Sequence, residues 1–223
     1  MSHKPSVLLI TLDALRPDHL GCYGYKRNTS PHIDRLAKEG ALFTQAIAQD
    51  TWTVPSMASL LTSTCPPQHG VSYFADTINS SLVTLPEVFK ENGYGTCFIG
   101  PYVISTIKGF NRGFDFFNTG TRRVFEHLPT SLFRHFSTFR MMAKFFLKMD
   151  NERADVITRK AVSWLAAQDS KPFFLWLHYF DAHGPYRPPS PFHKMFLNDG
   201  LEPGGNKHLP ILWKKIFGLG GIP

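Results

Sequence analysis

The stretch SVLLITLD, residues 6–13, decides the fold of this chain. Its apolar residues do not alternate with polar ones, which is typical of a strand buried on both faces of a parallel sheet. Asp13 follows directly, at the expected carboxyl end of that strand. Because open α/β sheets bind their ligands at this edge, the position of Asp13 alone makes it a candidate site residue.

Predicted strands and helices alternate along the rest of the chain. Strand-like runs recur at GTCFIG, residues 95–100, and at PFFLWLHYF, residues 172–180. Helical patterns with capping residues or an apolar stripe lie between and around them. They cover residues 30–40, a stretch beginning near Ser56, residues 84–93 and residues 154–168. This alternation predicts an α/β fold with a mainly parallel sheet flanked by helices on both faces.

The composition suits one α/β domain with an anionic partner. The chain has 223 residues and a formal net charge of +7. A positive balance favours nucleic acid, a membrane surface or a substrate bearing sulfate or phosphate. No groove-reading motif is present and the Lys and Arg residues are dispersed, so a nucleic-acid partner is not expected.

The cysteines and the apolar runs indicate the cellular compartment in which the protein is expected. Cys22, Cys65 and Cys97 form no CxxC pair, and three cysteines cannot all pair with each other. The apolar run at the start is too short for a signal peptide, and no run reaches the ~18 residues of a membrane span. The sequence therefore predicts a cytoplasmic protein with reduced cysteines.

One segment does not fit the alternation of predicted strands and helices. In SLFRHFSTFRMMAKFFLKMD, residues 131–150, Phe133, Phe136, Phe139 and Met142 recur every third residue among basic side chains. A basic amphipathic helix can make peripheral membrane contact, here through residues 133–149. The simpler interpretation is a helical insertion at about 125–150 that packs its apolar side on the domain.

Three separated stretches resemble the sulfatase family of the alkaline phosphatase superfamily. They are VLLITLDALRPDHLGCYGY (7–25), TWTVPSMASLLTSTCPPQHGV (51–71) and KPFFLWLHYFDAHGPYRPP (171–189). The resemblance implies an alkaline-phosphatase-like α/β domain over residues 1–190, corresponding to the N-terminal portion of the family's fold. Residues 191–223 are expected to be irregular, and the fold to be incomplete at its C-terminus.

The resemblance implies that Thr53 is the nucleophile and also a ligand of the metal. The family has Cys or Ser there, oxidised to formylglycine, followed by Pro and Arg; this chain has Thr53, Pro55 and Met57. Threonine cannot form that aldehyde, so Thr53 would act as an alkoxide at a helix N-terminus. We expect it to lie within about one side chain's reach of Asp13, with both residues at the carboxyl edge of the sheet. Ser56 is a candidate substrate contact. The alternative is that Thr53 and Ser56 only cap the helix; Cys65 is interpreted as a small apolar filler.

The metal and the acid are also implied by the resemblance. Asp13 is a hard oxygen ligand suited to Ca²⁺, Mg²⁺ or Mn²⁺. Many sulfatases have a second acidic residue where this chain has Ala14, so one ligand is missing. His183 matches a histidine that contacts the transferred group or protonates the leaving oxygen. The alternative is a loop pair of His183 with Asp181, and His178 is interpreted as core packing.

The sequence thus predicts a metal-dependent hydrolase or transferase for sulfate or phosphate esters. The substrate would be a small molecule, a glycan or a lipid. With so few ligands, the chain alone is expected to bind metal weakly and to have little or no activity. The alternative is a non-catalytic domain that keeps the fold and binds an anion or a partner.

Overall fold

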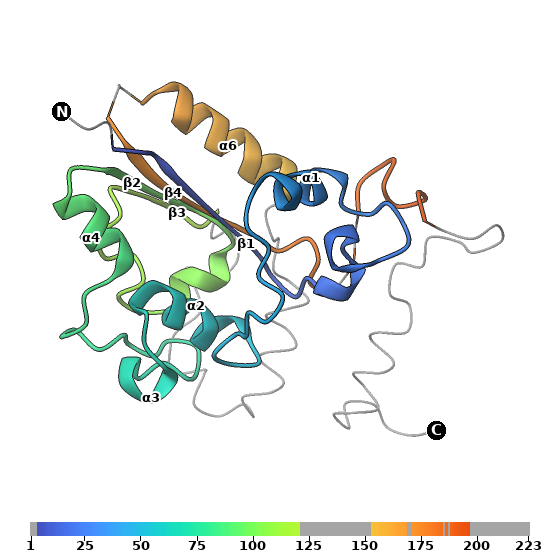
Figure 1. Cartoon of the computed structure of the whole chain (residues 1–223). Coiled ribbons are helices and arrows are strands. Elements are labelled where there is room, and N and C mark those ends of the chain that lie inside the picture. The colour runs from blue at the N-terminus through green and yellow to red at the C-terminus, as the bar shows by residue number, and fades with distance from the viewer. Residues whose placement is uncertain (1–3, 121–152, 169–170, 185, 187, 197–223) are drawn as a thin grey trace, which may run out of the picture.

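The computed structural model of the chain describes residues 4–120, 153–168, 171–184, 186 and 188–196. Its centre is a four-stranded sheet in the order β1-β4-β2-β3, with every neighbouring pair parallel (Figure 1). The strands are β1 (Val7–Leu12), β2 (Gly95–Ile99), β3 (Phe116–Asn118) and β4 (Phe173–Tyr179). The predicted parallel α/β architecture is confirmed, and β3 is an addition to the three predicted strands.

Helices lie on both faces of the sheet, as predicted. In Figure 1, α6 covers one face while α2 and α4 lie on the other. The α-helices are α1 (Pro31–Glu39), α2 (Thr53–Thr62), α3 (Pro66–His69), α4 (Leu85–Glu91) and α6 (Ala154–Ala166). Three short 3₁₀ helices accompany them: η1 (Pro17–His19), η2 (Gly21–Tyr23) and η3 (Tyr102–Thr106).

Helix α2 begins at Thr53, three residues before the predicted start near Ser56. Pro55 is compatible with this because the N–H groups of a first helical turn have no intrahelical acceptor. Apolar residues then recur at helical spacing and face the core. These residues are Val54, Met57, Ala58 and Leu61, each at most 3% exposed. This packing fixes the start of α2 against the sheet.

The two faces of the sheet form two apolar clusters. On β4, Phe174 and Trp176 point toward the side of α2 and α4, while Leu175 and Leu177 point toward α6. Trp176 is fully buried and lies among aromatic rings. This alternation is the period-2 pattern of a strand that is covered on both faces.

Strand β1 was predicted to be buried on both faces, but one of its faces is exposed. Leu8, Ile10 and Leu12 are 52%, 47% and 39% exposed, whereas Val7 and Leu9 pack against the cluster on the α2 side. The reason is that α6 packs on β4 and β2, and β1 lies outside them. Among the described strands, β1 pairs only with β4, so its outer edge and one face are uncovered.

Several predicted segments lie outside the described residues. These are the insertion at about 125–150, the membrane contact at 133–149 and residues 197–223. Over the part that is described, no helix has the length and apolarity needed to cross a membrane. The predicted domain boundary at 190 and the cytoplasmic location stay predictions.

His69 gives the fold a pH-dependent element. Its side chain is fully buried, with Nδ1 accepting from the Val71 N–H at 3.1 Å. Nε2 therefore carries the proton and donates to the Ser59 hydroxyl at 3.0 Å. Burial lowers the pKa of His69. Protonation of folded His69 would leave a buried charge and remove the acceptor of Val71.

We expect the free energy of unfolding to fall as the pH drops below about 6.5, because only the unfolded chain then binds a proton at His69. The loss continues until the lowered folded pKa is reached, at up to about 1.4 kcal/mol per pH unit. Urea denaturation at pH 7 and pH 5.5 measures it. His69→Gln should reduce the pH dependence, whereas His32→Gln, an exposed histidine on α1, should not. An equal pH dependence of the free energy of unfolding in the natural chain and in both variants would contradict the assignment of this effect to His69.

Candidate active site

Asp13 and Thr53 meet at the carboxyl edge of the sheet. Asp13 follows β1 in the same alternation as Leu9 and Thr11, which places it on the α2 side. Thr53 is the first residue of α2, and its Oγ1 donates a hydrogen bond of 2.7 Å to Asp13 Oδ2. The juxtaposition expected from the sequence is therefore present, although the two residues are 40 positions apart.

His178 also lies beside Asp13 at this edge of the sheet. In the parallel register, Thr11 of β1 pairs with His178 of β4. The imidazole is buried, its Nδ1 lies 2.7 Å from Thr11 Oγ1, and its Nε2 lies 3.4 Å from Asp13 Oδ2. The interpretation of His178 as a core residue was right about its burial and missed this contact with the candidate site.

Hydrogen bonding favours one tautomer of His178. Trp176 Nε1 donates to Thr11 Oγ1 at 3.1 Å, and the Thr11 hydroxyl has two possible acceptors, the Leu177 carbonyl at 3.3 Å and the nearer His178 Nδ1 at 2.7 Å. Nε2 then carries the proton and faces Asp13, whose carboxylate only accepts. At 3.4 Å this contact is long, and Nε2 is buried without a hydrogen-bond partner of ordinary geometry. We call Thr53, Asp13, His178, Thr11 and Trp176 the polar row.

The polar row keeps Asp13 ionised. Burial pushes the pKa of Asp13 upward, but the contacts with His178 and Thr53 outweigh burial, and the pKa lies below its ordinary value. The nearby His183 lowers it further. Asp13 is therefore an acceptor that orients the Thr53 hydroxyl and leaves the lone pairs of Oγ1 on the side away from the carboxylate.

His183 follows β4 in the loop after its carboxyl end, near enough to Asp13 to lower the pKa of that carboxyl. Its ring stacks on Phe180 at 4.2 Å, and Nδ1 donates to the Gly184 carbonyl at 2.6 Å. Asp181 instead accepts from the Ala154 N–H at the start of α6. This contact gives Asp181 a helix-capping role that is distinct from the loop pair weighed as an alternative for His183.

The remaining hydroxyl and thiol candidates have other partners. Ser56 Oγ donates to the Asp50 carbonyl at 2.9 Å, which ties α2 to the loop before it. The N-cap of α2 is Trp52, and no side-chain capping bond is made there, so neither Thr53 nor Ser56 caps the helix. Cys65 is exposed at the N-cap of α3, so its interpretation as an apolar filler was wrong.

The described residues do not fit a hard divalent ion by themselves. Asp13 supplies a carboxylate and Thr53 a hydroxyl, while Ala14 supplies no ligand. Among the residues that the structure describes, no three His, Cys, Asp or Glu side chains are grouped to hold a metal. Ca²⁺ takes six to eight oxygen ligands and Mg²⁺ six, so these two oxygens leave most positions to other ligands.

Comparison with known proteins identifies the family. The sequence model of the Sulfatase family matches residues 5–201. The chain belongs to the sulfatase family. Among its relatives is mouse iduronate 2-sulfatase, which is 30% identical over 92% of this chain. The chain spans 40% of the length of that relative.

Solved structures confirm the alkaline-phosphatase-like sulfatase fold. One is BT4656 in complex with its substrate D-glucosamine-2-N,6-O-disulfate, with a TM-score of 0.65 and 24% identity over 85% of this chain and 36% of that one. Another is phosphonate monoester hydrolase of Agrobacterium radiobacter, with a TM-score of 0.65 and 21% identity over 87% of this chain and 44% of that one. At these identities the likeness shows the fold alone.

Met57 is a core residue of α2. Its side chain, at the position where the resemblance implies the Arg of the family's motif, is 3% exposed. It packs in the cluster with the other apolar residues of α2. The described structure therefore places no cation at this position of the helix.

Proposed function

We propose that this sulfatase chain acts on sulfate esters of sugars, with Thr53 as the nucleophile. The observation that carries the proposal is the 2.7 Å hydrogen bond from Thr53 to the partly buried Asp13 at the carboxyl edge of the sheet. The glycan substrate is supported by the relatives and neighbours, which include an iduronate sulfatase and a glucosamine disulfate complex. The whole protein's activity rests on this proposal, because the chain spans less than half of these relatives.

The polar row supplies the orientation that the attack needs. As the bond from Thr53 Oγ1 to sulfur forms, the hydroxyl proton passes along the existing hydrogen bond to Asp13 Oδ2. The bond between sulfur and the ester oxygen breaks, and His183 is the candidate acid for that leaving oxygen. The first product is a threonine sulfate ester, which water hydrolyses in a second step.

A divalent metal, if bound, would stabilise the charge on the transferred group. Asp13 and Thr53 are the residues through which this chain would hold it. Since the described residues do not complete such a site, we expect weak metal binding and slow turnover from the 223-residue chain.

Mass spectrometry of the peptide containing Thr53 tests the proposal. Before reaction, residue 53 should have the mass of unmodified threonine, because oxidation to formylglycine requires a primary carbon. After incubation with an aryl sulfate, the same peptide should carry one added sulfuryl group. A mass deficit at residue 53, or a sulfuryl group on another residue alone, would overturn the assignment. If an aryl phosphate labels the peptide and the aryl sulfate does not, the transferred group is a phosphoryl group and not a sulfuryl group.

Ala14→Asp should strengthen metal binding. Ala14 directly follows Asp13 and has a left-handed backbone with φ 54°, a conformation that Asp and Asn tolerate better than most residues. A second carboxylate raises the charge and the number of ligands, so we expect Mn²⁺ affinity to rise at least about tenfold by isothermal titration. Ala14→Asn is the matched control, because it tolerates the same backbone without the charge. No gain in Mn²⁺ affinity for Ala14→Asp over the natural chain would argue against a metal at Asp13.

A further inference from the structure

The inner end of the polar row is formed by two side chains that the proposed reaction does not use directly. Trp176 is fully buried on β4, and its Nε1 donates to Thr11 Oγ1 at 3.1 Å. Thr11 is the register partner of His178 in the neighbouring strand, and its hydroxyl lies 2.7 Å from the imidazole Nδ1. These contacts connect the aromatic core with Asp13 and, through Asp13, with the hydroxyl of Thr53.

The Thr11 hydroxyl can serve both of its neighbours in the row at once. A hydroxyl has one hydrogen to donate and two lone pairs with which to accept. The indole N–H of Trp176 is only a donor, so it occupies a lone pair of Thr11 Oγ1 and leaves the hydrogen for another group. Of the two acceptors in reach, His178 Nδ1 at 2.7 Å is nearer than the Leu177 carbonyl at 3.3 Å. The shorter contact has the better hydrogen-bond distance, so Nδ1 is the acceptor.

The opposite tautomer of His178 would be unfavourable at the other end of the ring. With the proton on Nδ1, Nε2 would present a lone pair to Asp13 Oδ2, 3.4 Å away. Two acceptors would then face each other, and the buried Nε2 would have no donor to pair with. Burial of an unpaired polar atom is costly, so the contacts at both ends of the imidazole favour the same tautomer.

We propose that Thr11 and Trp176 are positioning residues for the Thr53 nucleophile, because they hold His178 as the tautomer whose Nε2–H faces Asp13. This inference rests on the proposed function and adds two residues that touch neither the substrate nor the reacting atoms. The imidazole on β4 and the hydroxyl on α2 both lie against Oδ2 of Asp13. A donor from each element therefore fixes the orientation of the carboxylate that directs the nucleophile.

NMR measures the tautomer of His178 without any reaction. In the full chain labelled with ¹⁵N-histidine, long-range correlations to the ring hydrogens distinguish a protonated ring nitrogen from an unprotonated one. The chain has ten histidines, so the signals of His178 are assigned as those that are lost in His178→Gln. We expect a protonated Nε2 and an unprotonated Nδ1 at neutral pH. A proton on Nδ1 alone, or on both nitrogens, would overturn the proposal.

Two substitutions of Thr11 test its part in selecting the tautomer. Thr11→Val removes the hydroxyl and nearly keeps the shape, so His178 Nδ1 loses its donor. We expect the ¹⁵N shifts of the two ring nitrogens to move toward each other, as they do when both tautomers are populated. Thr11→Ser keeps the hydroxyl and should retain the natural signals. Unchanged His178 signals in Thr11→Val would show that Thr11 does not select the tautomer, and the proposal would be wrong.

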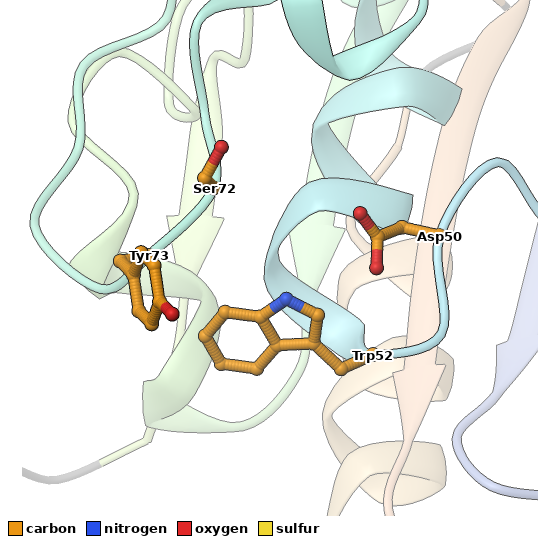
Figure 2. A pocket seen from close by; sticks show the side chains of 4 residues that line it. All are labelled: Asp50, Trp52, Ser72 and Tyr73. Carbon is orange, nitrogen blue, oxygen red and sulfur yellow. The ribbon is translucent and has the colours of Figure 1, made fainter.

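Trp176→Phe tests the indole, and Trp52→Phe is its matched control. Trp176→Phe removes the N–H that holds the Thr11 oxygen, so the His178 signals should move in the same direction as in Thr11→Val. Figure 2 shows Trp52 at a pocket that it lines with Asp50, Ser72 and Tyr73. Trp52→Phe should leave the His178 signals unchanged, because the indole of Trp52 is not part of the polar row. Equal shifts in both tryptophan variants would contradict a specific role of Trp176.

Sulfuryl transfer from an aryl sulfate to Thr53 connects the tautomer with the reaction. We expect Thr11→Val to react about tenfold more slowly than the natural chain, and Thr11→Ser at about the natural rate. Rescue by serine separates positioning through the hydroxyl from a general loss of packing. Absence of sulfuryl transfer in the natural chain would overturn the proposed function. An unchanged tautomer in Thr11→Val overturns the present inference whatever the rate, so the two failures are distinguishable.

Discussion

Replacing Thr53 by alanine is expected to lower the rate of sulfuryl transfer from an aryl sulfate to the protein by about 10³-fold or more. The hydroxyl is the group that forms the new bond, and Asp13 cannot replace it because an ionised carboxylate of lowered pKa is a weak nucleophile. The rate is measured as the appearance of the labelled peptide under single-turnover conditions, which does not require the slow second step.

Thr53→Ser is the matched control for this experiment. Serine keeps the hydroxyl that donates to Asp13 at 2.7 Å and removes only the methyl group. We expect its labelling rate to stay within about tenfold of the natural chain. Labelling of Thr53→Ala at the natural rate would show that the nucleophile is elsewhere. Absence of labelling in the natural chain would make the non-catalytic binding domain the better description.

Removing the imidazole of His178 should have the second largest effect. His178→Leu leaves Asp13 without its partner on β4, so the carboxylate is free to shift away from Thr53. Displacement of a reacting group by about 1 Å costs about 10²-fold in rate. We therefore expect Thr53 labelling to fall by about that factor, with a loss of about 1–3 kcal/mol in the free energy of unfolding.

Gln and Asn at position 178 separate a positioning role from a purely structural one. The amide of Gln reaches the place of Nε2, which faces Asp13, whereas that of Asn reaches the place of Nδ1, which faces Thr11. Labelling should be rescued by His178→Gln and not by His178→Asn. If both variants lose rate only in proportion to their stability, as measured by urea denaturation, His178 serves the fold alone.

The sequence predicted the parts of the site that follow from strand ends and motif position. Asp13 and Thr53 were both placed at the carboxyl edge, and the structure brings them into contact. His178 was missed because a buried histidine in an apolar strand is indistinguishable from core packing when that strand is considered alone. The period-2 pattern of both strands could have found it, since His178 shares a face with Trp176 as Asp13 does with Thr11.

The other differences between prediction and structure arise from strand order and from contacts between distant segments, which a single sequence does not reveal. The apolar run of β1 predicted burial on both faces, but only the sheet order shows that α6 lies over β4 and β2. The edge-to-face contact between the rings of Trp52 and Tyr73 likewise exists only in the folded chain. Each of these features is a tertiary contact between segments that local propensity treats separately.

The uncovered side of β1 has a consequence for the behaviour of the protein in concentrated solution. Three leucine and isoleucine side chains, Leu8, Ile10 and Leu12, stand on one face beside a row of main-chain groups that no other described strand pairs with. Such an edge is a template for intermolecular strand addition. Colloidal stability should therefore decrease with protein concentration, and Ile10→Lys should raise the concentration at which light scattering first increases. A charge at that point interrupts both the apolar stripe and the approach of a second strand.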